Sequence, residues 1–246
     1  MVPNDEDQPQ GQFSTKPLYL QARDALVKRI MGGEWKPGIS IPSEGDLARE
    51  MGVSPGTVRK ALDLLESEHL LTRRQGRGTF VTDRNSMEMV LRFTNIRNSN
   101  GERLVDSVTS CSIVTGEATD LECARLRLEP RSPVYRIRRV RLTGGRPYMA
   151  DETSMPCEPF PGLAEKEHLS QHICVLLGQY GILPGQARER ISAGAATPAV
   201  AATLGLASGS PIVVLDRVVF SLDGNPVEWR IGYCHFAEEY YLAKTA

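Results

Sequence analysis

An internal repeat is the feature that most constrains how this chain can fold. Residues 118–143 and 196–221 match at an offset of 78 residues, and each copy then continues through a glycine and a proline into a second apolar run. The repeated unit is therefore predicted to be helix, turn, strand, hairpin, strand. Two copies are too few for a solenoid, which needs about three. We expect one pseudo-symmetric antiparallel sheet flanked by helices. The identical pairs are Ala118/Ala196, Thr119/Thr197, Ala124/Ala202, Leu126/Leu204, Leu128/Leu206, Ser132/Ser210, Pro133/Pro211, Arg139/Arg217 and Val140/Val218.

Residues 17–82 have a different pattern, which predicts three helices. Apolar residues recur every four positions from Leu18 to Ile30, which indicates an amphipathic helix ended by two glycines. Ser43 is expected to cap a second helix and Ser54 a third. The third helix has a proline at its first position, where a missing N–H costs nothing.

A hairpin is predicted directly after the third helix. Two short β runs, 71–74 and 79–81, flank a glycine-containing turn. Two helices joined by a short turn and followed by a hairpin are typical of a winged helix-turn-helix. A generic small helical domain is the alternative. The tip "RRQGRG" favours the winged form, because three arginines around two glycines suit phosphate contact and entry into a minor groove.

The net charge of the whole chain does not indicate a nucleic-acid partner. The formal net charge is −1, so contact with DNA has to come from local clustering of basic side chains.

The segment 17–82 resembles the DNA-binding domain of the GntR family of bacterial transcription factors. The resemblance rests on "IPSE.DLA", "GVS..TVRKAL" and "L..RQGRGTFV". It implies double-stranded operator DNA as a partner, with the third helix in the major groove and the hairpin tip in the minor groove. The residues expected at this interface are Ser43, Glu44, Ser54, Thr57, Arg59, Lys60, Arg73, Arg74, Gln75, Gly76, Arg77 and Gly78.

Two positions depart from that family. Relatives commonly carry arginine where this chain has Gly45 and Pro55, and arginine favours guanine. We therefore expect the scaffold to be retained while base reading shifts towards Thr57 and Arg59.

The second half, from about residue 88 to 243, resembles the UTRA effector-binding domain of the HutC subfamily of GntR regulators. The resemblance rests on "SPVYRIRRVRL..GRPYMADETSMP" and "SPIVVLDRVVFS.DGNPVEW". It implies the chorismate-lyase-like fold and a bound small molecule. The expected fold class is therefore α+β.

The repeat helps to sort the arginines of the predicted strand 134–142. Alternation places Arg139 and Arg141 on one face and directs Arg136 and Arg138 to the other, towards solvent. Arg139 has a counterpart in the second copy, Arg217, so pairing with a carboxylate in both halves could explain why arginine stands at both positions. Arg141 corresponds to a valine, which makes it the better candidate for binding an anion.

The resemblance implies further residues around an acidic effector. Arginines of this strand contact effectors such as phosphosugars in similar proteins, and phosphonates and carboxylates are the other classes expected. Glu228 could instead face solvent. A cysteine at 234 where the family often has tyrosine, and an aspartate at 151 where it has glutamate, leave the identity of the effector open. The expected effector-binding residues are Arg139, Arg141, Asp151, Thr153, Ser170, Glu228 and Tyr233.

The predicted organisation is a disordered tail (1–16), a winged helix-turn-helix domain (17–82), a linker (83–90) and an effector-binding and dimerisation domain (91–246). The polar, acidic start does not resemble a secretory signal, and no run of about 18 uncharged apolar residues predicts a membrane span. Five scattered cysteines without a CxxC favour reduced thiols in the cytoplasm. His168 and His172 have a spacing that can hold a metal, yet no third ligand is apparent. No metal or cofactor is predicted.

The leading hypothesis is a ligand-responsive bacterial regulator, usually a repressor, that binds an inverted-repeat operator as a homodimer. The effector would alter DNA affinity by biasing the placement of the two DNA-binding heads. One alternative is a lyase-like enzyme with a DNA-binding appendage, although fold alone does not carry function, and release of pyruvate from chorismate would test it. Another is a scaffold or corepressor that has lost operator specificity.

Overall fold

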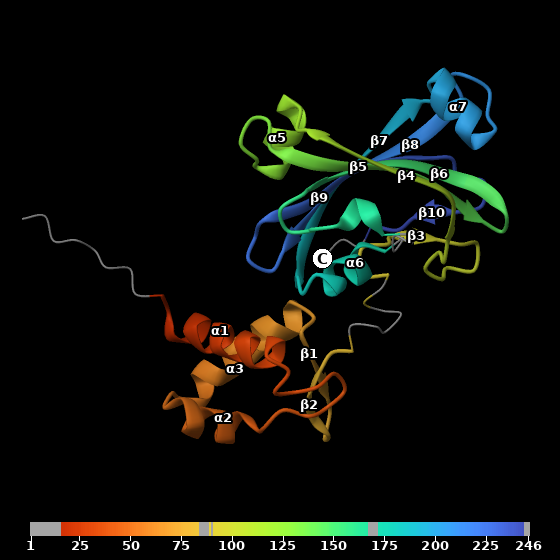
Figure 1. The fold of residues 1–246 in the computed structure, drawn as a ribbon. Coiled ribbons are helices and arrows are strands. Elements are labelled where there is room, and N and C mark those ends of the chain that lie inside the picture. Colours follow the sequence, from red (N-terminus) through yellow and green to blue (C-terminus); the bar gives the residue numbers. More distant parts are fainter. Residues whose placement is uncertain (1–15, 84–88, 90, 167–171, 244–246) are drawn as a thin grey trace, which may run out of the picture. The chain divides into compact units, whose positions relative to one another are not determined.

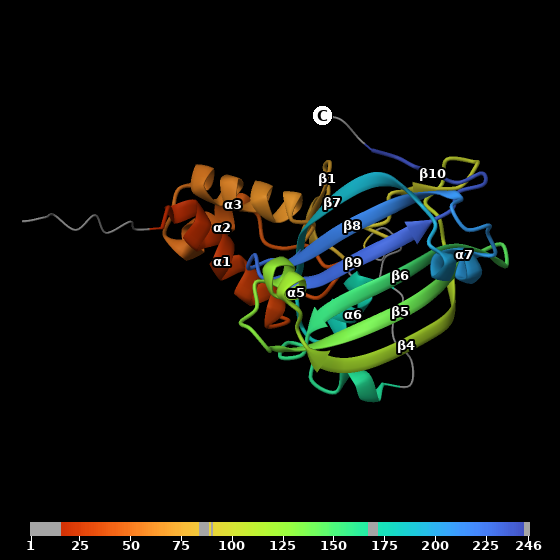
Figure 2. The same cartoon turned by 90° about the horizontal axis from the view of Figure 1, so that it is seen from above.

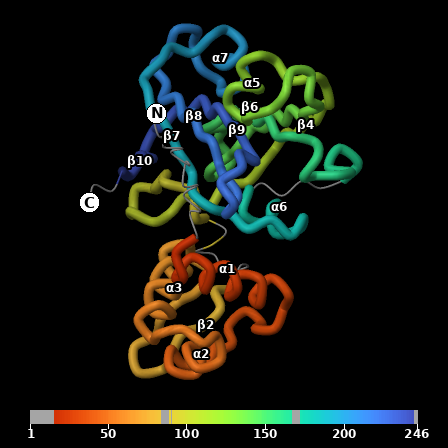
Figure 3. The backbone as a smooth tube through the Cα atoms, turned by 90° about the vertical axis from the view of Figure 1, so that its left-hand side faces the viewer, coloured from red at the N-terminus to blue at the C-terminus, as the bar shows by residue number. Residues whose placement is uncertain are grey.

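The computed structural model describes residues 16–83, 89, 91–166 and 172–243. Its contacts divide the chain into two compact units, residues 1–82 and 83–246, and Figure 3 traces the backbone through each. Nearly all of the predicted tail and of the predicted linker lies outside the described residues, so these two boundaries stay predictions.

The first unit has the predicted order of elements (Figure 1). Its helices bury their apolar stripes against one another, with Leu26, Leu47 and Leu62 almost fully buried. A two-stranded antiparallel hairpin follows. The elements are α1 (Leu18–Met31), α2 (Glu44–Met51), α3 (Pro55–Ser67), β1 (Leu71–Arg74) and β2 (Gly78–Val81).

The second unit is built on a six-stranded antiparallel sheet with the order β4-β5-β6-β9-β8-β7 (Figure 2). The α+β fold class is confirmed. The strands are β4 (Ser107–Glu117), β5 (Pro133–Thr143), β6 (Arg146–Pro156), β7 (Pro184–Ala195), β8 (Pro211–Ser221) and β9 (Pro226–Cys234).

The repeat is realised as two matching modules. Helix α5 (Asp120–Leu126) precedes β5 and β6, and α7 (Pro198–Leu204) precedes β8 and β9. The modules join where β6 pairs with β9 in the middle of the sheet. Each helix begins at a threonine whose hydroxyl accepts a backbone N–H three residues later.

The two faces of the sheet carry different helices. Leu126 of α5 packs with Val218 and Trp229, and Ala201 of α7 packs with Ile212 on the same face. Helix α6 (Ile173–Gln179) covers the opposite face, as Figure 1 shows. We call these the α5/α7 face and the α6 face. Helix α6 has seven residues, and the segment 167–171 before it lies outside the described residues.

Three short elements complete the second unit: β3 (Ile96–Arg97), β10 (Tyr240–Tyr241) and a 3-10 turn, η1 (Leu163–Glu165). β3 pairs with β10, and Ile96 and Tyr241 pack in a cluster with Tyr148 and Leu215. Among the described residues no helix is both long and apolar enough to cross a membrane.

Candidate functional site

The start of α3 is fixed by a local hydrogen-bond network. The Ser54 hydroxyl accepts the backbone N–H of Thr57 at 3.1 Å, and the two side-chain oxygens lie 2.9 Å apart. Pro55 occupies the first helical position and is exposed. Ser54 therefore acts as a cap, whatever else it does.

The start of α2 is built in the same way. Ser43 accepts the backbone N–H of Asp46 at 3.2 Å, and its hydroxyl donates to the Asp46 carboxylate at 2.6 Å. Gly45 is exposed, and a Cβ built there would meet only the Ser43 Oγ, at 3.9 Å. The fold has room for a side chain at this position.

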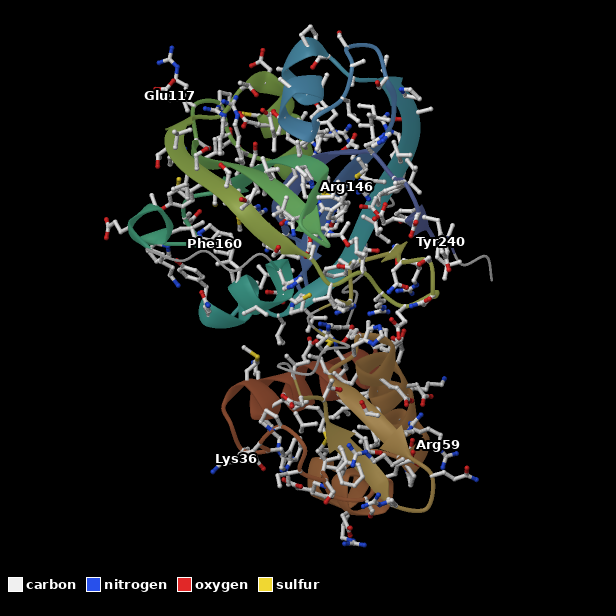
Figure 4. All side chains as sticks on the ribbon, turned by 90° about the vertical axis from the view of Figure 1, so that its right-hand side faces the viewer. Lys36, Arg59, Glu117, Arg146, Phe160 and Tyr240 are labelled. Atoms are coloured by element: carbon white, nitrogen blue, oxygen red, sulfur yellow. The ribbon has the colours of Figure 1, made fainter. Side chains whose placement is uncertain are left out.

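Glu44 connects α2 to the two elements that follow. Arg59 of α3 donates from Nε to its carboxylate at 2.9 Å, and the Arg73 guanidinium of β1 lies 3.6 Å from its other oxygen. Arg73 also contacts Asp63 at 2.5 Å and Glu66 at 3.0 Å. Arg73 is thus held against α3 by acids, whereas Arg59 is 65 % exposed and extends from the surface of the unit (Figure 4).

The hairpin tip presents the other cations. Arg74 stacks on the Phe80 ring, with 4.6 Å from Cζ to the ring centre, while Arg77 in the turn is exposed, as is Lys60 on α3. Gly76 and Gly78 have φ values of 70° and 108°, which the turn requires and which glycine adopts without strain. The tip is narrow, basic and open to solvent.

Most of the predicted effector residues meet in a buried charged cluster on the α6 face. Asp151 accepts from Arg139 Nε at 3.1 Å and from Arg141 Nε at 2.5 Å. Thr153 accepts from Arg139 Nη2 at 3.0 Å. Burial alone would raise the pKa of Asp151, but Arg141 and Arg139 hold it well below its usual range.

The sequence interpretation missed Asp106. This residue accepts from Arg141 Nη1 at 3.1 Å and from the Tyr148 hydroxyl at 2.7 Å. It lies one residue before β4, in a segment without any periodic pattern, so no sequence signal marked it. Burial would lower the pKa of Arg141, but Asp151 and Asp106 raise it above its usual value.

A second group of charges continues the cluster across β8, β9 and β7. Arg217 donates to Glu228 at 2.7 Å, so the expected shared role is observed, because Arg139 and its counterpart Arg217 each pair with a carboxylate. Glu228 is 2 % exposed and does not face solvent. Arg230 and Glu189 lie 3.6 Å apart. Within the described residues, Arg217 Nε and Arg230 Nε have no hydrogen-bond partner.

The cavity at this cluster is small. It measures about 20 Å³ and is lined in part by Asp106, Arg141, Glu189 and Arg230, which is space for roughly one water molecule. Pockets that bind drug-sized ligands measure about 300–1,000 Å³, so an effector at this place would have to open the cluster.

Of the other two predicted effector residues, Tyr233 does not join the cluster. Tyr233 is paired with Ala150 and Val214 and therefore lies on the α5/α7 face, while Ser170 is outside the described residues. His172 is described and His168 is not. No group of three metal-ligating side chains occurs among the residues that the structure describes.

The expected orientation of Arg136 towards solvent is wrong. Its Nε donates to Glu122 of α5 at 2.8 Å, and Glu122 also accepts from Ser154 at 2.7 Å. This happens because α5 covers that part of the sheet. Arg138, by contrast, is 75 % exposed and pairs with Glu152.

Both units match known protein families. The family described as bacterial regulatory proteins, gntR family, matches residues 18–81, and the UTRA domain matches residues 90–238.

Curated relatives match most of the chain. The HTH-type transcriptional repressor NagR of Bacillus subtilis is 30 % identical over 217 residues, which are 86 % of this chain and 88 % of that protein. The HTH-type transcriptional regulator Rv0792c of Mycobacterium tuberculosis is 33 % identical over 239 residues, 93 % of this chain and 86 % of that protein. The histidine utilization repressor of Pseudomonas putida is 26 % identical over 208 residues, 83 % of each chain.

Solved structures share the fold. The ligand-binding domain of a putative GntR-family regulator from Bordetella bronchiseptica superposes with a TM-score of 0.56 at 24 % identity, covering 63 % of this chain and 98 % of that one. PhnF from Mycobacterium smegmatis superposes with a TM-score of 0.53 at 22 % identity, covering 92 % and 99 %.

Proposed function

The chain belongs to the GntR family of DNA-binding transcriptional regulators, in its HutC subfamily, and we propose that it is a homodimeric repressor whose affinity for operator DNA changes when a small acidic metabolite binds. The observation that supports this most directly is the pairing of two units in one chain. One presents exposed cations on a helix and a hairpin tip, and the other encloses a buried cluster of arginines and carboxylates.

In the proposed DNA complex, α3 enters the major groove and the hairpin tip enters the minor groove. Thr57 and Arg59 read bases, while Lys60, Arg74 and Arg77 contact phosphates. A homodimer places two such heads on an inverted repeat, one on each half-site.

Operator affinity should therefore depend steeply on salt, because each neutralised phosphate releases counterions. The test is fluorescence anisotropy of labelled duplexes, selected from a randomised pool, at several NaCl concentrations. Sedimentation at the same protein concentrations checks the dimer. A flat salt response, or a monomer bound to one half-site, contradicts the proposal.

The effector is proposed to bind at the Arg139–Arg141–Asp151 cluster. An anion entering there would replace Asp151 or Asp106 as the partner of a guanidinium, and charge-assisted bonds to a phosphate or carboxylate are strong. Arg217 Nε and Arg230 Nε supply further buried donors. Mannosyl-D-glycerate and histidine, which occur in the names of two relatives, both carry a carboxylate.

Opening the cluster couples the two sites. If effector binding favours one arrangement of the second unit and operator binding favours another, each ligand changes the affinity for the other by the same factor. The effector class proposed is a phosphosugar, phosphonate or small carboxylate.

Thermal-shift screening of the full chain against these three classes tests the effector proposal. We expect an anionic compound to raise the melting temperature and to change operator affinity, with both effects lost in Arg141→Ala. Arg138→Ala, which removes an exposed arginine from the opposite face, is the matched control. Stabilisation by uncharged compounds alone would overturn the acidic class.

A further inference from the structure

A second, strongly basic hollow lies on the α5/α7 face, away from the cluster just described. It measures about 340 Å³ and lies between the end of α5 and the strands β7 and β8. Figure 2 shows α5 and α7 at opposite ends of this face. The charged side chains that open into the hollow are Arg125, Arg127, Arg188, Arg190 and Asp216.

The hollow contains four guanidinium groups and one carboxylate, that of Asp216. Asp216 accepts from Arg125 at 2.6 Å and from Arg190 at 2.9 Å. Arg127 and Arg188 lie over the Phe220 ring, 5.5 and 5.3 Å from its centre, and within the described residues they form no salt bridge. Glu189, whose backbone also lines the hollow, directs its carboxylate to the α6 face, where it accepts from Tyr241.

The repeat allows each arginine of this hollow to be compared with the residue at the equivalent place in the other copy. Arg188 pairs with Val218 as Ser110 pairs with Val140, so Arg188 and Ser110 are equivalent, and Arg190 is equivalent to Ser112 in the same way. The matching hollow at α7 measures about 480 Å³, and its lining includes Arg138 and Glu152. At the places of Arg188, Arg190 and Arg125, however, it has Ser110, Ser112 and Thr203. The fold therefore does not need arginine at these places.

The backbone conformation at two arginines also indicates that the fold does not need arginine there. Arg127 has a φ of 54° and Arg131 a φ of 65°, in the left-handed region that disfavours residues with a side chain. Their counterparts are Gly205 and Gly209, with φ values of 70° and 83°. Both arginines occupy turn positions at which the other copy uses glycine, and Arg127 lines the hollow.

We propose that this basic hollow binds the phosphate groups of a compact polyanionic small molecule. Guanidinium groups match phosphate oxygens in a bidentate fork, and Asp216 holds two of them in place while their other N–H groups remain available. The hollow is lined by residues of β7 and β8 on the sheet and by residues at the end of α5. The second unit carries 18 Lys and Arg against 19 Asp and Glu, so it provides no long-range attraction for an extended polyanion. This site is independent of the proposed effector site.

The test is calorimetric titration of the full chain with pyrophosphate. The double variant Arg127→Gly with Arg188→Ser installs the residues that the other copy already carries, and it removes one left-handed arginine, so folding is not at risk. We expect pyrophosphate to bind at least about ten-fold more weakly to it. Arg138→Ser, which takes an exposed arginine from the matching hollow, should bind pyrophosphate as the unaltered chain does.

Two results would overturn the proposal: no saturable binding of pyrophosphate to the unaltered chain, or equal binding to the double variant. A parallel titration with non-operator duplex DNA separates the sources of phosphate. If the double variant loses affinity for the duplex and keeps it for pyrophosphate, the hollow serves DNA and the small-molecule assignment is wrong.

Discussion

Arg73 illustrates how a residue's contacts refine a role that its type suggests. The sequence predicts a DNA contact, yet its guanidinium lies among Glu44, Asp63 and Glu66. These contacts hold the hairpin against α3, which favours a positioning role. Arg77, at the exposed tip, has no such partners within the described residues.

The two arginines should therefore respond differently to substitution. Arg77→Ala should reduce the slope of log affinity against log salt by about 1 for each subunit. Arg73→Ala should leave that slope nearly unchanged and lower the melting temperature of the first unit by about 4 °C, from about 1 kcal/mol of lost ion pairing. Anisotropy and calorimetry on the two variants distinguish these cases, and equal slopes would contradict the assignment.

Arg141 and Asp151 show that burial of charge was only partly predictable. The alternation of side chains along the strand correctly placed Arg139 and Arg141 on the same face. The repeat correctly suggested that Arg139 pairs with a carboxylate. Tyr233 could have been assigned to the other face, because it lies five residues after Glu228 and an odd separation reverses the side. Arg230, two residues after Glu228, could have been found by the same rule.

At the scale of elements, the starts of α2 and α3 tolerate change. Pro55 and Gly45 are exposed, and Gly45 has space for a side chain. Pro55→Arg and Gly45→Arg should fold normally and shift the preferred operator towards sites with an added guanine. Selection from a randomised operator pool measures this shift. Unchanged preference in both variants would remove these positions from base reading.

Helix α5 depends on a buried carboxylate. Glu122 accepts from Thr119, Arg136 and Ser154. Burial opposes its ionisation, yet these donors lower its pKa to about 2 from the usual 4.5. The folded state thus binds fewer protons, so this stabilisation is present above about pH 4.5 and is lost as the pH falls towards 2.

Glu122→Gln should cost about 2 kcal/mol of stability at neutral pH. Its melting temperature should fall less steeply than that of the unaltered chain between pH 5 and 3, because one titrating group is missing. Thermal melts at stepped pH values measure both effects. A variant that kept the original pH dependence would show that Glu122 does not contribute to it.

At the scale of the whole molecule, most of what could be predicted about the fold of the second unit followed from the repeat. It indicated helix, strand, hairpin and strand twice, and the structure joins these modules through β6 and β9. It could not indicate which side each helix covers, and this is why Arg136 was misplaced. Nor could it reveal Asp106, since that residue belongs to neither copy.

The edges of the six-stranded sheet differ in a way that matters when the protein is stressed. β7 carries Arg188, Glu189 and Arg190, whereas β4 carries one ionisable acid, Glu117, at its last position. Charged side chains on an edge discourage a strand from another chain from adding to it, while a long uncharged edge invites one. Misassembly on heating should therefore grow from the β4 side. A charge placed there, as in Ser112→Lys, should slow light-scattering growth more than Ser192→Lys on β7.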